Sequence, residues 1–250
     1  MRGENRAMQL HSTTVGSGAR HVGLIHGLGA DGTTWQPFIE RMLATNRYTV
    51  TTVDLRGHGR SERADSYSLE HLADDVAESL PTGLHSVVGH SLGGSVLVRA
   101  VRRLQPARAV YLDPGFGLSL PTSGLAGRAF WAVPTLTLGV VGLMQARRGA
   151  AVKASYSPDV RALLKDSNAR FDSTMAVGVF RDVAFHRLAV GAPDVPSTIV
   201  LSDESPSVLP PAMVSGLQGA GWDIRRLTGV HHDMQLESPD RTFELLQDIL

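Results

Sequence analysis

Apolar runs of strand length alternate with longer amphipathic runs along most of the chain. Strand-like runs fall at residues 8–14, 21–26, 48–54, 84–88, 108–113, 197–201 and 223–227. Helix-like runs fall at 34–44, 69–80 and 92–104, and a last one begins at Ser238. Alternation of this kind is typical of an α/β protein. The pattern therefore predicts a mostly parallel, twisted sheet flanked by helices.

The alternation stops after Asp113 and returns only near Ser197. Residues 114–194 contain helix-like stretches and glycines but no convincing strand. We therefore expect a core formed by residues 1–113 and 195–250, with residues 114–194 inserted as a helical cap. Ligands of open α/β sheets bind beyond the carboxyl ends of the strands, where such an insertion would act as a lid.

A Gly-x-Ser-x-Gly motif centred on Ser91 lies between a predicted strand and a predicted helix. Such a sharp strand-to-helix turn exposes the serine, and Gly89 and Gly93 lack the β-carbons that would collide there. The turn also places the Leu92 amide at a helix N-terminus, where a negative oxygen is stabilised. The motif predicts a nucleophilic serine, which needs a base from elsewhere in the chain; the alternative is a glycine-rich turn with an idle serine.

Composition narrows the function classes. The chain has 24 Lys plus Arg and 24 Asp plus Glu, so no net positive field favours nucleic acid as a partner. It has no cysteine, which excludes disulfides, thiolate chemistry and Cys-based zinc sites. Residues 1–12 include Arg2 and Arg6 but no apolar run typical of a secretory signal. We expect a cytoplasmic enzyme without a cofactor.

An uncharged run, residues 129–146, lies between Arg128 and Arg147 inside the insertion. Its length just admits a membrane span, but Pro134 and two glycines favour an apolar helical segment packed over a pocket. A basic cluster formed by Arg147, Arg148 and Lys153 is expected to be a solvated face.

Four segments follow one another in a recognisable order: 26–29 (HGLG), 54–61 (DLRGHGRS), 89–94 (GHSLGG) and 229–239 (GVHHDMQLESP). In these segments the chain resembles the α/β-hydrolase family, in its single-chain form with a cap. The resemblance implies that the Leu28 amide forms an oxyanion hole together with the Leu92 amide. It also implies that His26 orders its loop and that Arg56 and His58 belong to a structural turn.

The resemblance selects His232 as the base, because the family pattern places the histidine five residues before Glu237. His231 then occupies a position where the family commonly has glycine. A metal site at residues 231–233 is conceivable, but no further ligands at useful spacing support it.

In the family, the acid that orients the histidine usually lies a few residues beyond the strand represented here by 199–201. Aligning on the end of this strand puts Ser205 at that position, and aligning on residues 210–211 puts Pro206 there, so the acid is missing. Asp113, at the end of the strand after the elbow helix, is the favoured substitute, because some cap-bearing relatives carry their acid there. The pair Asp203 and Glu204 remains an alternative, as does a Ser–His dyad without an acid. Loss of the acid can cost about 10⁴-fold in turnover.

Together these features predict a serine hydrolase that cleaves an ester, lactone or thioester of a small hydrophobic substrate through an acyl-enzyme. Apolar residues of the insertion could form a substrate wall or the core of the cap itself: Phe116, Phe130, Trp131, Leu136, Leu138, Val140, Val141, Leu143 and Met144. The other readings are a non-hydrolytic binder or biosynthetic cyclase on the same fold, and a hydrolase anchored by residues 129–146.

Overall fold

A computed structural model describes residues 7–118, 120–203 and 209–250. Seven strands form one sheet in the order β1-β3-β2-β4-β5-β6-β7. The strands are β1 (Ser12–Gly16), β2 (Arg20–Ile25), β3 (Tyr48–Val53), β4 (Ser86–His90), β5 (Arg108–Leu112), β6 (Ser197–Ser202) and β7 (Asp223–Leu227). All neighbours pair in parallel except β1, which pairs antiparallel with β3. The predicted mostly parallel sheet is thus confirmed.

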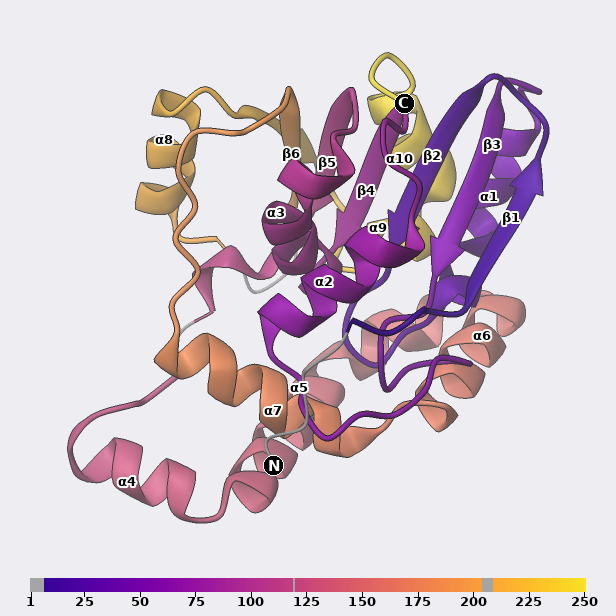
Figure 1. The fold of residues 1–250 in the computed structure, drawn as a ribbon. Coiled ribbons are helices and arrows are strands. Elements are labelled where there is room, and N and C mark those ends of the chain that lie inside the picture. Colours follow the sequence, from indigo (N-terminus) through magenta and orange to yellow (C-terminus); the bar gives the residue numbers. More distant parts are fainter. Residues whose placement is uncertain (1–6, 119, 204–208) are drawn as a thin grey trace.

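Helices cover both faces of this sheet (Figure 1). On one face α2 (Leu69–Ser79), α3 (Leu92–Leu104) and α8 (Pro211–Gly219) pack against the strands through a large buried cluster. On the other face α1 (Gln36–Leu43), α9 (Met234–Glu237) and α10 (Pro239–Leu246) bury a second cluster. β4 and β6 are buried along their whole length, as parallel strands covered on both faces are.

Element boundaries differ from the predicted ones mainly near the N-terminus. Strand β1 begins four residues later than the predicted run at 8–14, because the Met8 and Leu10 amides donate to the Asp75 and Ser79 side chains of α2. The predicted helix 34–44 is a short 3₁₀ turn, η1 (Gly32–Trp35), followed by α1 with Pro37 in its first turn. The hydrogen bonds of Met8 and Leu10 with α2 thus decide where β1 begins. Such long-range contacts leave no trace in the hydropathy pattern of the sequence.

Between β5 and β6 the described residues form a 3₁₀ turn, η2 (Gly115–Gly117), and four helices. These are α4 (Gly124–Ala132), α5 (Pro134–Ser155), α6 (Pro158–Ala169) and α7 (Ser173–Phe185), called the cap helices below. They lie beyond one end of the sheet, as Figure 1 shows. That end is the carboxyl end of β4, where Ser91 lies.

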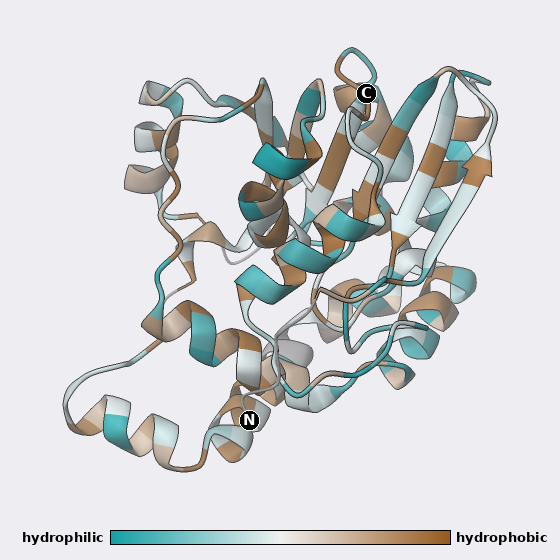
Figure 2. Ribbon diagram, viewed as in Figure 1, coloured by the Kyte–Doolittle hydropathy of each residue, from teal (hydrophilic) through white to brown (hydrophobic). Residues whose placement is uncertain are grey.

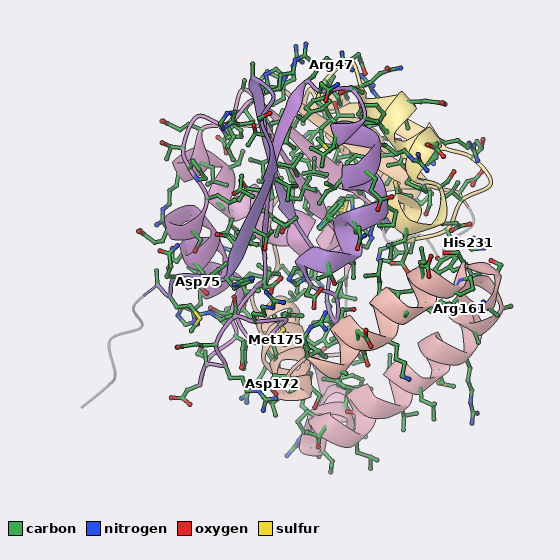
Figure 3. All side chains as sticks on the ribbon, turned by 90° about the vertical axis from the view of Figure 1, so that its right-hand side faces the viewer. Arg47, Asp75, Arg161, Asp172, Met175 and His231 are labelled. Atoms are coloured by element: carbon green, nitrogen blue, oxygen red, sulfur yellow. The ribbon has the colours of Figure 1, made fainter. Side chains whose placement is uncertain are left out.

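The second half of the cap helices is tied to the core by specific bonds. Arg170, just after α6, donates two hydrogen bonds to one carboxylate oxygen of Asp31, at 2.6 and 2.9 Å. Asp172 accepts from the Tyr67 hydroxyl at 2.8 Å, and Asp182 accepts from the Leu69 amide at 2.8 Å. Figure 3 shows Asp172 and Met175 at the junction of cap and core, and Met175 is fully buried there.

The first half of the cap helices stands away from the core and exposes apolar side chains. Leu125 and Leu136 are 84% and 63% exposed. Of the nine apolar residues expected to form a substrate wall or a cap core, Phe116 and Leu138 are buried. Five are exposed, and none lines the cavity beside Ser91: Leu136, Val140, Val141, Leu143 and Met144. For these five residues both expectations were wrong, because their side chains lie at the surface of α5, away from its contacts with α4 and α7. Figure 2 shows hydrophobic segments among paler and hydrophilic ones in the outlying cap helices.

The uncharged run 129–146 is divided between two helices. Among the described residues, no single helix is long and apolar enough to cross a membrane. Residues Gly124–Ala132 and Pro134–Met144 meet that criterion only as a pair, bent by 95° at the break.

Candidate active site

Ser91 occupies the sharp turn between β4 and α3. Its backbone has φ 52° and ψ −113°, a conformation that residues other than glycine rarely adopt. A β-carbon on Gly89 would come within 2.5 Å of the Gly93 carbonyl oxygen, and one on Gly93 within 2.3 Å of the Ile25 carbonyl oxygen. The two glycines therefore allow α3 to pass close enough to β2 and β4 to hold Ser91 in this strained turn.

The Leu92 and Leu28 amides, which the resemblance assigns to an oxyanion hole, lie on the two segments that meet at Ser91. Leu92 begins α3, so its N–H has no partner within the helix. The loop of Gly27 and Leu28 lies against the serine, since a β-carbon on Gly27 would be 3.2 Å from the Ser91 β-carbon. No hydrogen-bond partner of the Leu28 amide occurs among the residues that the structure describes.

Buried histidines hold this loop in place. His26 accepts from the Leu55 amide and donates to the Gly27 carbonyl, while His58 accepts from the Gly29 amide at 3.1 Å. Burial lowers the pKa of His26 to about 4 and that of His58 to about 3, so both rings are neutral near pH 7. Arg56 forms a buried ion pair with Asp75. These contacts order loops, as the resemblance implied for all three residues.

Asp113 lies against the ring of His232. One carboxylate oxygen is 3.3 Å from His232 Nδ1, and the carboxylate also accepts from the amide and the hydroxyl of Ser202. Asp113 directly follows β5, is 3% exposed and has a positive φ of 36°. Parallel pairing of β5 with β6 places Ser202 beside it.

The other carboxylate left open by the sequence has a different partner. Asp203 accepts a hydrogen bond from the Gly229 amide at 2.6 Å, at the start of the loop that carries His232. Glu204 lies outside the described residues. The neighbouring His231 forms a hydrogen bond between its own Nδ1 and Glu237 at 3.0 Å, so the two adjacent histidines point to different carboxylates.

The pKa of His232 is raised above its ordinary value by two carboxylates. Burial of the ring lowers the pKa, but the hydrogen bond to Asp113 and the negative charges of Asp233 and Asp113 outweigh it. Lys153 contributes a smaller opposing effect. In the neutral ring, an Nδ1–H that donates to Asp113 leaves Nε2 available to accept a proton, and the raised pKa makes His232 a stronger base.

His90, within the serine motif, has a positioning role that the sequence did not reveal. Its Nε2 donates to the His232 carbonyl at 3.0 Å, and the two rings pack with centroids 4.7 Å apart. Burial and the nearby His232 lower the pKa of His90 to about 4, so the ring stays neutral. A histidine between Gly89 and Ser91 gives no sequence signal for this contact, because its partner lies 142 positions away.

A cavity of about 410 Å³ lies beside the serine and His232. Ser91, His232 and Leu28 line it from the core, together with Asp233 from the histidine loop. The cap helices contribute four residues: Lys153, Leu164, Lys165 and Asn168. Figure 3 shows His231 and Arg161 on the side where the histidine loop meets these helices. Among the described residues, no group of three or more His, Cys, Asp or Glu side chains could hold a metal ion.

The seven-stranded sheet, with a serine on the turn after β4 and a histidine on the loop after β7, defines an α/β-hydrolase fold. A model of the alpha/beta hydrolase family matches residues 24–245. The chain belongs to that family.

Two curated relatives match part of the chain. It is 42% identical over 95 residues to a pimeloyl-[acyl-carrier protein] methyl ester esterase of Methylococcus capsulatus, a match that covers 38% of this chain and 36% of the relative. It is 34% identical over 111 residues to the esterase of the same name from Nitrosomonas europaea, covering 43% of this chain and 42% of the relative. The matches thus span less than half of either relative.

Solved structures match over nearly the whole chain. The enol-lactonase of Burkholderia xenovorans has a TM-score of 0.73 at 21% identity, covering 96% of this chain and 95% of its own. An epoxide hydrolase of Bacillus megaterium has a TM-score of 0.74 at 17% identity, covering 96% of each chain. These likenesses concern the fold.

Proposed function

We propose that this protein is a serine hydrolase that cleaves a carbonyl-centred bond, an ester, lactone or thioester, through an acyl-enzyme. Ser91 is the nucleophile, His232 is the general base, and Asp113 orients and stabilises the His232 ring. The amides of Leu28 and Leu92 bind the oxyanion. The observation that carries the proposal is the contact of Asp113 with His232 Nδ1, on the cavity that Ser91 also lines.

The chemistry follows from these positions. Nε2 of His232 takes the proton of the Ser91 hydroxyl as its oxygen attacks the carbonyl carbon, and the carbonyl oxygen becomes an anion between the two amides. The imidazolium then protonates the leaving oxygen or sulfur, which departs and leaves a serine ester. Water attacks this ester with His232 again as base, and Ser91 regains its proton.

The curated relatives support hydrolysis of an ester, since both are methyl ester esterases. The reading as a non-hydrolytic binder rested on the missing acid. The contact between Asp113 and His232 supports the hydrolase over that reading.

The test is to treat the protein with a serine-directed phosphonate and with p-nitrophenyl esters of several chain lengths. We expect ester turnover and labelling at Ser91. Ser91→Ala should lose both and fold normally, while Ser215→Ala, on the exposed side of α8, should keep both. Absence of turnover and of labelling in the unaltered protein would refute the hydrolase and favour a binder.

A further inference from the structure

Of the 24 lysines and arginines in the chain, only two are lysines, and both line the cavity beside Ser91. Lys153 lies in the last turn of α5 and Lys165 lies within α6. The other 22 are arginines, and none of them lines this cavity.

Neither lysine is neutralised by the protein. Among the described residues no ion pair or side-chain hydrogen bond involves Lys153 or Lys165, whereas Arg170 and Arg56 are paired. The cavity contains one opposing carboxylate, Asp233, so its lining carries two positive charges and one negative charge besides His232.

The lysines belong to a part of the cap that is held in place. Tyr156 and Val160, at the junction of α5 and α6, form a buried cluster with Leu236 of α9, which follows the histidine loop, and Val152 and Leu164 pack against it. The ion pair of Arg170 with Asp31 fixes the other end of α6. Each lysine therefore projects from a helix whose distance from the catalytic loop is set by packing.

Helix electrostatics explain only part of this arrangement. A cation in the last turn of a helix is stabilising, which accounts for Lys153 on α5. Lys165 is not in the last turn of α6, so it gains nothing comparable there. What the two residues share is the cavity.

We propose that Lys153 and Lys165 form a subsite for an anionic group, a carboxylate, carried by the substrate at a distance from its scissile carbonyl. This inference rests on the proposed hydrolase function and replaces the expectation of a largely hydrophobic substrate. Leu28, Leu164 and Leu236 line the same cavity and add apolar surface to it. An ammonium on a flexible stem binds carboxylate as a point charge, which suits substrates of more than one length.

The experiment compares matched substrates with and without the charge. Ethyl hydrogen adipate is compared with ethyl hexanoate, which places the carboxylate on the acyl side. 4-Acetoxybenzoate is compared with 4-acetoxybenzamide, which places it on the alcohol side. We expect kcat/KM for one charged member to exceed that of its neutral partner by about tenfold, mainly through KM, and to fall as NaCl is raised.

The double variant Lys153→Met/Lys165→Met should lower the charged-to-neutral ratio of kcat/KM about tenfold. The ratio is the proper readout, because the Lys153 charge also acts on His232 and so alters the rates of both esters. Lys153→Arg/Lys165→Arg should largely restore the ratio. Arg147→Met, an exposed basic position on the same helix that does not line the cavity, should leave it unchanged.

Two outcomes separate failure of this subsite from failure of the hydrolase. If neutral esters are hydrolysed in a Ser91-dependent way but no charged substrate is preferred, or the lysine variants keep the ratio, the subsite is refuted and the hydrolase stands. If no ester is hydrolysed, the proposed function fails, and adipate binding measured by calorimetry still tests the subsite. Loss of adipate binding in the double variant would support the subsite, and equal binding by both proteins would refute it.

Discussion

At the scale of single residues, the carboxylate that contacts the His232 ring is that of Asp113. Asp113 lies one strand earlier in the chain than the usual family position, yet β5 and β6 are neighbours and their carboxyl ends meet the same loop. The carboxylate is held by Ser202 as well as by His232, so its orientation does not depend on the imidazole alone.

Asp113→Asn should lower kcat by roughly 10³ to 10⁴-fold, because the amide leaves His232 in the wrong tautomer. Asp203→Asn is the matched control. An asparagine oxygen can still accept from the Gly229 amide, so the loss should stay under about tenfold. Steady-state ester hydrolysis measures both, and a larger loss for Asp203→Asn would overturn the assignment of Asp113.

The pH dependence of kcat/KM should show a single acid limb with its midpoint above 6.5, the ordinary imidazole value, because the pKa of His232 is raised. His232 must be neutral to accept a proton, so activity rises with pH through this midpoint. Asp233→Asn removes one of the charges that raise the pKa, and the limb should move to lower pH. A limb that stays in place or moves upward would contradict this electrostatic account. His90 adds no second limb near neutrality, because its pKa is about 4.

At the scale of elements, the turn from β4 into α3 depends on close backbone approach. The strained backbone conformation of Ser91 persists because the surrounding strands and α3 hold the turn in place. Its carbonyl accepts hydrogen bonds from the Gly94, Ser95 and Gly115 amides, which tie the turn to η2 after β5.

Gly93→Ala should destabilise the protein by about 1 to 3 kcal/mol, since the new β-carbon forces α3 away from the Ile25 carbonyl. Gly216→Ala provides the control. It lies in α8 with open space around the added carbon and should be neutral, or stabilising by up to about 1 kcal/mol. Denaturant unfolding of both variants gives the comparison, and equal stabilities would show that the turn relaxes freely.

At the scale of the whole molecule, apolar side chains have two different fates. Those of the sheet and its covering helices are buried in two clusters, one on each face of the sheet. Leu125 of α4 and most of the large apolar side chains between Leu136 and Met144 of α5 remain exposed.

Leu97→Ala, in α3, should lower the free energy of unfolding by about 2 to 5 kcal/mol, because this side chain is fully buried and leaves a cavity. Leu136→Ala, in α5, should change it by no more than about 0.5 kcal/mol, since 63% of that residue is exposed. Chemical denaturation tests the pair. A large loss for Leu136→Ala would mean that the exposed cap surface is covered in solution.

The sequence by itself determined the alternation of strands and helices and the serine turn, and the family resemblance selected His232 as the proposed base. These are properties of short segments, where periodicity, glycine positions and local spacing carry the information. It narrowed the acid to a few candidates. It assigned Lys153 to a solvated basic cluster and the exposed apolar residues of α5 to a wall or a core.

Only the tertiary structure showed that Asp113 contacts the His232 ring while Asp203 bonds to the Gly229 amide, that His90 bonds to the histidine loop, and that both lysines line the cavity of Ser91. The physical reason is the same in each case. These contacts join residues far apart in the chain, across strands whose order in the sheet differs from their order in the sequence. No local pattern of polar and apolar residues records which loop ends meet, because that depends on how the sheet is assembled and where the cap helices dock.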